Sequence, residues 1–305
     1  MIPIIKPKVK PKVKPYQKPY GNPFTPYLFL LPNFCIFFMF IVIPAIFGFF
    51  YAFTEWDGIS KITLVGLDNF KSIFQNRVFW EALERTLVYV IITVPLLFVV
   101  SLMLAILLIQ KIRFKGIFRA IFYWPTMISF VIVGVTWKWM LGDNFGIINY
   151  ILTIGGYKPI RWLTDPVYSN LSVIAATIWS RAGFYMVMFI SGLQSIPLTY
   201  YEACDIDGAS TIQKFRYITI PLLKPTSFLV LILSMIDTFK AYALVFSLTE
   251  GGPAKATTYL VQTIYEYGFE RYQLGYASAL SVILFAVLSS LTVIQFKLNK
   301  GGEVL

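Results

Sequence analysis

Residues 86–109 read TLVYVIITVPLLFVVSLMLAILLI, a run of 24 residues without a charged side chain. About 20 apolar residues in a helix are enough to cross the hydrocarbon core of a bilayer. This stretch therefore predicts a transmembrane helix. Residues 28–53 form another uncharged run, of 26 residues, which is too long for the apolar segment of a signal peptide and predicts a second span.

Four further segments have spanning length. Residues 120–141 and 276–296 are strongly apolar, whereas residues 171–193 contain Arg181 and residues 226–248 contain Asp237 and Lys240. The prediction is an all-α polytopic membrane protein with six transmembrane helices. The whole chain divides into a cytoplasmic Lys/Pro-rich tail (1–27), a transmembrane domain (28–297) and a short cytoplasmic tail (298–305).

The composition agrees with a membrane protein and excludes several kinds of enzyme. Hydrophobic residues make up 57% of the 305 residues and charged residues 13%, which is too little polar surface for a soluble globule. The chain has no histidine, so histidine-based nucleophile systems and histidine-ligated metals are excluded. Cys35 and Cys204 are too few and too far apart for a disulfide framework. We expect no catalytic residue, no metal site and no cofactor bound by this chain.

The net charge of +11 comes from basic residues that cluster beside the apolar runs, which argues against a nucleic-acid-binding groove. Fifteen lysines and arginines fall in the two tails and in the loops after the second and fourth spans, against seven in the three opposite loops. Basic loops are retained in the cytoplasm, so both termini are predicted to be cytoplasmic. The fifteen are Lys6, Lys8, Lys10, Lys12, Lys14, Lys18, Lys111, Arg113, Lys115, Arg119, Lys214, Arg216, Lys224, Lys297 and Lys300.

The loop between the fourth and fifth spans carries the most informative polar sequence, LTYYEACDIDGASTIQKFRYITIP over residues 198–221. Thr199 followed by Glu202 predicts a capping box and a helix starting at Tyr200, and Gly208 supplies a left-handed turn at its end. Ser210 and Gln213 predict a second capping box. The second helix should then be broken by Pro221 and Pro225 at the membrane entry.

The pattern of this loop resembles that of permease subunits of ATP-driven importers, the ABC importers. It is carried by Glu202, Ala203, Gly208, Ile218 and Pro221, all at the family's spacing. Cys204 and Ile220 depart from the commonest residues, alanine and leucine, with little change in size. Three further segments resemble the carbohydrate-uptake branch of the family: NFGIIN (144–149), GLQSIP (192–197) and LTEGGP (248–253). The resemblance to the family covers residues 26–297.

The resemblance implies a function for the loop over residues 194–225. In that family it forms coupling helices that dock into a groove of a cytoplasmic ATPase, and we expect seven residues to serve this contact. Glu202 would offer a carboxylate to the partner, although it can also merely cap its own helix. The seven are Glu202, Ala203, Asp207, Gly208, Phe215, Ile218 and Pro221.

Charges inside the predicted spans are costly, on the order of 3 kcal/mol each on insertion scales, so Arg181, Asp237 and Lys240 are candidates for function. They can either neutralise one another or line a transport path. Lys138, between two tryptophans, is expected to extend its ammonium to the interface.

Sugars bind aromatic rings and fixed polar groups, and the fourth and fifth spans offer both. By resemblance to positions lining the sugar site in that family, together with Tyr242, we predict a substrate path made of Thr177, Ser180, Arg181, Phe184, Leu233, Asp237 and Tyr242.

The implied assembly is an importer in the cytoplasmic membrane of a prokaryote. It would contain a second permease subunit, so that the two permeases form a heterodimer. It would also contain two cytoplasmic ATPases and an extracytoplasmic sugar-binding protein, and no nucleic acid. No phosphate-binding glycine loop followed by lysine occurs, so ATP and Mg would be bound by the partner ATPase. An ion-gradient-driven secondary transporter is the alternative, in which the intramembrane charges would relay ions. An intramembrane enzyme is disfavoured because the spans hold no paired carboxylates.

Overall fold

A computed structural model describes residues 24–110 and 112–299 of the chain. The predicted tails, 1–27 and 298–305, lie outside the described residues except at 24–27 and 298–299. Lys111 and Lys300 lie outside them as well. The chain divides into two compact units, residues 1–48 and residues 49–305.

The first unit contains α1 (Thr25–Phe37), the π-helical η1 (Phe38–Val42) and the start of α2 (Ile43–Tyr51). Together they run as one helix from Thr25 to Tyr51, long and apolar enough to cross a membrane. The predicted span 28–53 is therefore helical along almost all of its length. Its apolar residues lie on every side of the helix, as expected where lipid or another protein is the solvent.

The described residues of the second unit form helices and one short hairpin, joined by loops. The hairpin pairs β1 (Thr54–Glu55) with β2 (Thr63–Leu64) in antiparallel fashion. Its helices up to the 194–225 loop are α3 (Asp68–Gln75), α4 (Arg77–Ile109), α5 (Lys115–Tyr123), the 3₁₀ turn η2 (Trp124–Met127), α6 (Phe130–Met140), α7 (Ile147–Ile154) and α8 (Pro166–Gln194).

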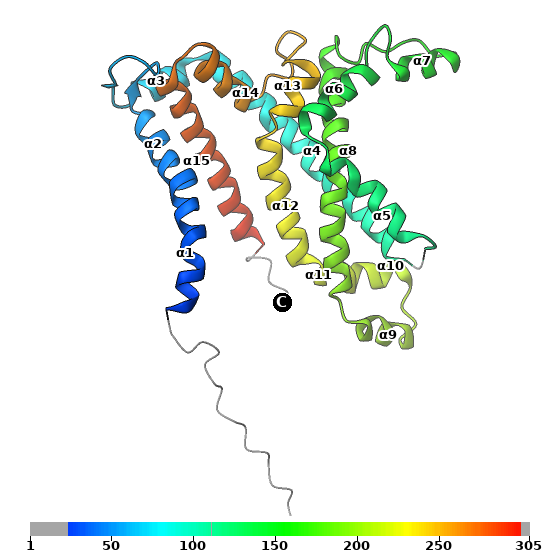
Figure 1. Ribbon diagram of the computed structural model, residues 1–305. Coiled ribbons are helices and arrows are strands. Elements are labelled where there is room, and N and C mark those ends of the chain that lie inside the picture. Colours follow the sequence, from blue (N-terminus) through cyan, green and yellow to red (C-terminus); the bar gives the residue numbers. More distant parts are fainter. Residues whose placement is uncertain (1–23, 111, 300–305) are drawn as a thin grey trace, which may run out of the picture. The chain divides into compact units, whose positions relative to one another are not determined.

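From residue 198 the second unit continues with shorter helices and ends in one long one. These are α9 (Leu198–Ile206), α10 (Thr211–Lys214), the π-helical η3 (Phe215–Thr219), α11 (Ile220–Leu222), α12 (Lys224–Phe239), α13 (Ala243–Thr249), α14 (Leu260–Tyr265), the π-helical η4 (Glu266–Glu270) and α15 (Leu274–Leu298). Within this unit, α9 lies at one end of the long helices and α13 and α14 at the other, hereafter the α9 end and the α14 end (Figure 1).

Helices α4 and α8 form the centre of this unit. Each begins with a side-chain cap: Asn76 accepts a hydrogen bond from the Val78 amide, and Asp165 accepts from the amides of Val167 and Tyr168. Tyr89 of α4 hydrogen-bonds Thr177 of α8 at 2.8 Å and stacks on Tyr259 with ring centroids 4.5 Å apart. These contacts bury polar groups with their partners satisfied, as an interior requires.

The predicted span 120–141 is bent, and a second bend lies just before the predicted span 226–248. Four helices are each long and apolar enough to span a membrane. The number of candidate spans rises to six if each of two bent pairs counts as one span; the pairs are 115–127 with 130–140 and 211–222 with 224–239. The first pair is bent by 100°, where Pro125 lies in a 3₁₀ turn and Ile128 is extended. The second is bent by 65° at Leu223.

The prediction of one helix over residues 226–248 was wrong. Helix α12 ends at Phe239, and α13 begins only at Ala243. The intervening residues, Lys240 to Tyr242, contain neither glycine nor proline, so the sequence carries no local signal for this break. The break matters because it brings Lys240 and Tyr242 to the wall of a cavity, described below.

Candidate functional site

The 194–225 loop folds into a compact helical hairpin whose turn is set by Gly208. Its φ of +71° lies in the left-handed region, as predicted. The Ala209 amide donates to the Cys204 carbonyl at 2.9 Å and the Gly208 amide to the Asp205 carbonyl at 3.2 Å. This pair of bonds is a Schellman motif, which satisfies the last carbonyls of α9 and fixes the direction in which the chain leaves it.

The second half of the hairpin starts at the predicted capping box. The Ser210 hydroxyl accepts from the Gln213 amide, and the Gln213 side chain accepts from the Ser210 amide at 2.7 Å. Lys214 then forms an ion pair with Asp205 of α9. Tyr201 of α9 also hydrogen-bonds Thr219 of η3 at 2.9 Å. The two halves are thus joined by an ion pair and a hydrogen bond as well as by the turn.

One prediction about this loop was wrong. Helix α9 starts at Leu198, with Pro197 as its N-cap and no side-chain cap, so Thr199 lies within the first turn and makes no capping box with Glu202. Pro197 itself has a ψ of 133°, and the helix begins directly after it. The second helix runs through η3 and α11 to Leu222 and breaks at Leu223, between Pro221 and Pro225, as predicted. A π-helical turn before a proline shifts the backbone pairing and accommodates its missing N–H.

The hairpin exposes most of the residues predicted to contact an ATPase. Glu202, Ala203, Asp207, Gly208 and Pro221 are exposed. Phe215 and Ile218 are half-buried, and Ile218 packs against a core cluster beneath the hairpin. Sequence reasoning missed Ile206 and Ile212, which are 87% and 78% exposed on either side of the Gly208 turn. Exposed isoleucines flanking a tight turn are the signal that could have found them.

A cavity of about 270 Å³ lies beside the break between α12 and α13. Its walls come from α4, α6, α8, α12 and α13, and we name it the charged cavity. The residues lining it are Leu97, Phe130, Thr177, Arg181, Asp237, Thr238, Lys240, Ala241, Tyr242, Ala243 and Leu244.

Arg181 and Asp237 form an ion pair across this cavity, with Nη2 and Oδ2 3.4 Å apart. The Tyr185 hydroxyl donates to the same Asp237 oxygen at 2.9 Å, and the Arg181 guanidinium lies 4.3 Å from the centre of the Phe130 ring. The two side chains remain 25% and 37% exposed. Arg181 and Asp237 therefore pair with each other and also line the cavity.

Lys240 differs from that pair. It is exposed and has no ion-pair partner within residues 24–110 and 112–299. It is the C-cap of α12, its amide donates to the Ile236 carbonyl at 3.2 Å, and it lines the same cavity as Asp237. The cavity wall thus carries one cation in excess of its ion pair.

Four of the seven residues predicted for the substrate path line the cavity: Thr177, Arg181, Asp237 and Tyr242. The other three do not. Ser180 is buried and donates to the Thr177 carbonyl at 3.0 Å, and Phe184 packs against the α4–α8 core. Leu233 is exposed on α12.

At the α14 end, the Lys138 side chain forms an ion pair. Its ammonium lies 2.7 Å from a carboxylate oxygen of Glu250, which follows α13. The hydrogen bond and charge of Lys138 hold the pKa of Glu250 below its usual value. This contact connects α6 with the loop after α13.

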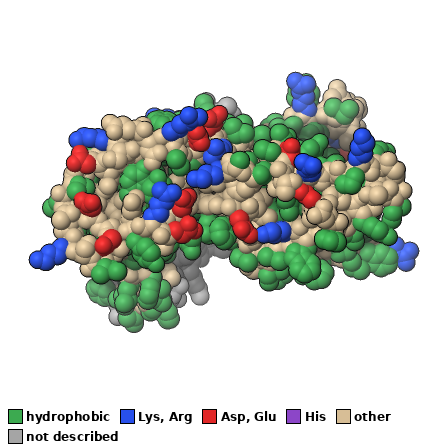
Figure 2. Space-filling model, turned by 90° about the horizontal axis from the view of Figure 1, so that it is seen from above, with side chains coloured by type: hydrophobic (Ala, Val, Ile, Leu, Met, Phe, Trp, Pro, Cys, Tyr) green, Lys and Arg blue, Asp and Glu red, His purple; other side chains and the backbone are tan. Residues whose placement is uncertain are grey.

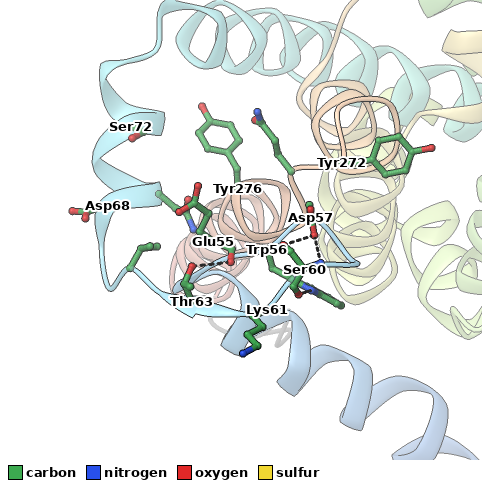
Figure 3. A pocket seen from close by; sticks show the side chains of 13 residues that line it. Glu55, Trp56, Asp57, Ser60, Lys61, Thr63, Asp68, Ser72, Tyr272 and Tyr276 are labelled. Atoms are coloured by element: carbon green, nitrogen blue, oxygen red, sulfur yellow. Dashed lines mark hydrogen bonds between the residues drawn. The ribbon is translucent and has the colours of Figure 1, made fainter.

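A hollow of about 640 Å³ opens between the β1–β2 hairpin, α3 and the start of α15 (Figure 3). Asp57 organises the hairpin turn: it accepts from the amides of Ser60 and Ile59 at 2.7 and 2.9 Å and from the Ser60 hydroxyl at 2.8 Å. These hydrogen bonds lower the pKa of Asp57 to about 2.

Figure 2, which views the molecule from the α14 end, shows basic and acidic side chains interspersed over that face.

Comparison with known proteins identifies the family. Residues 70–301 match the family described as "Binding-protein-dependent transport system inner membrane component". The chain belongs to this family. It is therefore a multi-pass membrane protein and an ABC-transporter permease, the non-catalytic membrane subunit of an importer.

The permease has relatives that are similar along nearly their whole length. It is 32% identical to the trehalose/maltose transport system permease protein MalF of Thermococcus litoralis, over 90% of this chain and 93% of that one. It is 33% identical to the sn-glycerol-3-phosphate transport system permease protein UgpA of Brucella suis, over 89% and 93%. A bacterial ABC transporter involved in the import of the acidic polysaccharide alginate has a chain with a TM-score of 0.79 at 25% identity, over 90% and 94%. These matches assign the fold of the type I importer permease.

Proposed function

We propose that this permease imports carbohydrates, that it forms half of a translocation path with a second permease, and that the 194–225 loop couples the path to a cytoplasmic ATPase. The observation that supports this best is the arrangement of the second unit. A charged cavity lies among its long helices, and a rigid exposed hairpin lies at their α9 end (Figure 1). Relatives named for trehalose/maltose transport support the substrate class.

The hairpin suits a coupling contact for mechanical reasons. A helix pair joined by the Lys214–Asp205 ion pair and the Schellman turn moves as one body, so a displacement imposed on α9 passes to α12 through Leu223. Its exposed isoleucines, Ile206 and Ile212, offer apolar area to a groove, and Glu202 offers a carboxylate. Residues 194–225 are thus the proposed ATPase contact.

The charged cavity suits a hydroxylated substrate. Asp237 can accept hydrogen bonds from sugar hydroxyls, Arg181 can donate to them, and the Tyr242 ring offers a face to sugar C–H groups. Thr177 adds a hydroxyl. Alternating access of the cavity to the two sides of the membrane would be driven by the ATPase.

The proposed assembly follows from this role. It contains two different permeases, two ATPases that hold ATP and Mg, and an extracytoplasmic sugar-binding protein, in the cytoplasmic membrane of a prokaryote. The α9 end would face the cytoplasm and the α14 end would face the binding protein. Six spans over residues 28–297, with both termini cytoplasmic, give this orientation.

Cysteine labelling tests the orientation. In a chain without Cys35 and Cys204, single cysteines at Lys8, Lys115, Lys214 and Asn299 should react only from the cytoplasm. Cysteines at Asp57, Lys158 and Lys255 should react only from outside. A reversal at Lys158 or Lys214 would contradict six spans.

Uptake assays test the coupling. Glu202→Lys reverses the charge offered to the ATPase, and Ala203→Trp blocks close approach, while neither touches the cavity. Both should abolish copurification of the ATPase and stop uptake, with Glu84→Lys as an exposed charge-reversal control that leaves both intact. Uptake that survives these changes and collapses with the proton or sodium gradient would establish an ion-driven transporter instead.

A further inference from the structure

Four aromatic side chains form a continuous row at the α14 end. Tyr242 stacks on Phe246 with ring centroids 5.4 Å apart and on Tyr265 with centroids 4.9 Å apart. Tyr265 in turn lies 5.1 Å from Phe269. Successive ring planes are inclined by only 23°, 30° and 31°. We name these four side chains the aromatic row.

The row connects two cavities that share no lining residue. Tyr242 lines the charged cavity. Phe246 and Tyr265 line a second hollow of about 330 Å³, here the acidic hollow, whose wall also includes Glu250, Lys255, Gln262, Glu266 and Glu270, three carboxylates against one ammonium. The row therefore runs from the acidic hollow to the charged cavity.

The Phe269 end of the row is open to solvent or to a ligand. Phe269, at the end of the row, is 64% exposed, and among the described aromatic residues it contacts only Tyr265. One face of its ring is therefore free. Exposed aromatic residues also occur where membrane proteins meet the lipid headgroups. Lipid contact alone does not account for a row that borders a polar hollow.

The polar groups of the hollow are not all occupied. Glu250 is paired with Lys138 and Glu266 with Arg271, whereas Glu270 has no ion-pair partner in the described part of the chain. The Gln262 side chain donates from Nε2 to the Glu250 carbonyl at 3.2 Å, but its Oε1 is buried and has no hydrogen-bond partner among the described residues. Glu270 is exposed and can accept hydrogen bonds from ligand hydroxyls, whereas the buried Gln262 Oε1 lies out of a ligand's reach.

We propose that the aromatic row and the acidic hollow form a second carbohydrate-binding site, which holds a pyranose sugar between the binding protein and the charged cavity. The apolar face of the sugar lies on Phe269 and Tyr265, and its hydroxyls donate to Glu270. Apolar rings beside a few fixed polar groups are the combination that sugar sites use. The inference rests on the proposed function, since it requires that the substrate be a carbohydrate.

Loss of this site should weaken the coupling between sugar import and ATP hydrolysis. In proteoliposomes that contain the whole importer, Phe269→Ala should lower the sugar imported per ATP hydrolysed by about threefold to tenfold, the size expected for losing one aromatic contact. Sugar released by the binding protein would escape outward before it reached the charged cavity. ATP hydrolysis stimulated by the loaded binding protein should stay unchanged, and Phe269→Trp should restore coupling. Phe145→Ala removes another exposed ring and serves as the control, because Phe145 lies outside the row.

Trehalose and maltotriose, which contain pyranose rings, are the probes, each loaded on the binding protein. If the wild-type importer drives ATP-dependent uptake of a probe and Phe269→Ala is coupled as well as Phe145→Ala, the second site is refuted. If Phe269→Ala instead lowers copurification of the second permease, the row is a subunit contact and the site is likewise refuted. Failure of the wild-type importer to take up any probe sinks the proposed function itself, and the second site with it.

Discussion

In the 194–225 loop the defining contacts join residues close in sequence, whereas in the charged cavity they join residues far apart. Ser210 and Gln213 are 3 positions apart, and Lys214 and Asp205 are 9 apart. At the cavity, Tyr185 and Asp237 are 52 positions apart, and Tyr89 and Thr177 are 88 apart. A short closed loop loses little chain entropy, so local motifs can specify it. The cavity depends on how α4, α6, α8, α12 and α13 pack.

This difference predicts that backbone crowding near the cavity has the largest effect on stability. A Cβ at Gly134 of α6 would lie 2.6 Å from the Ser247 Cβ and 2.7 Å from the Leu244 carbonyl oxygen of α13. Gly134→Leu should therefore separate the two helices and destabilise the permease by about 3 kcal/mol. The measurement is the midpoint of thermal unfolding in detergent.

Gly116 provides the matched control, because a Cβ there has nothing within 4 Å. Gly116→Leu should leave the unfolding midpoint near that of the wild type. Equal stability of the two variants would mean that the contact between α6 and α13 is not tight, and that the cavity wall is not built as described.

Breaking the ion pair of the charged cavity should have the next largest effect on stability. Arg181→Ala leaves Asp237 with only the Tyr185 hydroxyl, and we expect it to cost about 2 kcal/mol, less than a fully buried pair because both side chains are partly exposed. The double variant Arg181→Met with Asp237→Leu should regain most of that stability, since it leaves no unpaired charge. Both variants should lose sugar uptake. A double variant that is less stable than either single one would show that the charges are not coupled.

The same contrast explains how much the sequence could predict. The left-handed turn at Gly208 and the capping box at Ser210 depend on a few neighbouring residues, so their chemistry is legible. The length of the apolar runs likewise predicted the long helices, because a span must be long enough to cross the hydrocarbon core of the bilayer. The break after Phe239 has no glycine or proline to announce it, so residues 226–248 were wrongly predicted as one unbroken helix. The rings of Tyr242 and Tyr265 meet only through tertiary packing, which no local pattern encodes.

In the loop, Gly208→Val should have a smaller effect on stability, of about 1 kcal/mol, because a β-branched residue is disfavoured at a φ of +71°. The unfolding midpoint should barely change, while the ATPase is retained less well on purification. Gly208→Asn is the matched control, since asparagine tolerates the left-handed region better than other residues. If valine and asparagine behave alike, the turn is not what orients the two halves of the hairpin.

Ser210→Ala should have the smallest effect, and it tests whether the loop is as local as its hydrogen bonds indicate. The substitution removes the acceptor for the Gln213 amide at an exposed helix start, which should cost about 0.5 kcal/mol. Because the capping box is reciprocal, Gln213→Ala should cost about as much, and the double variant should cost less than the sum of the two. Hydrogen exchange of the α10 amides measures this directly, with an increase of about twofold expected in the single variants. Amides of α8 and α12 should exchange at the wild-type rate. A change that spreads into α12 would mean that even this small cap is coupled to the membrane helices, and the division between a locally built loop and a packed cavity would no longer hold.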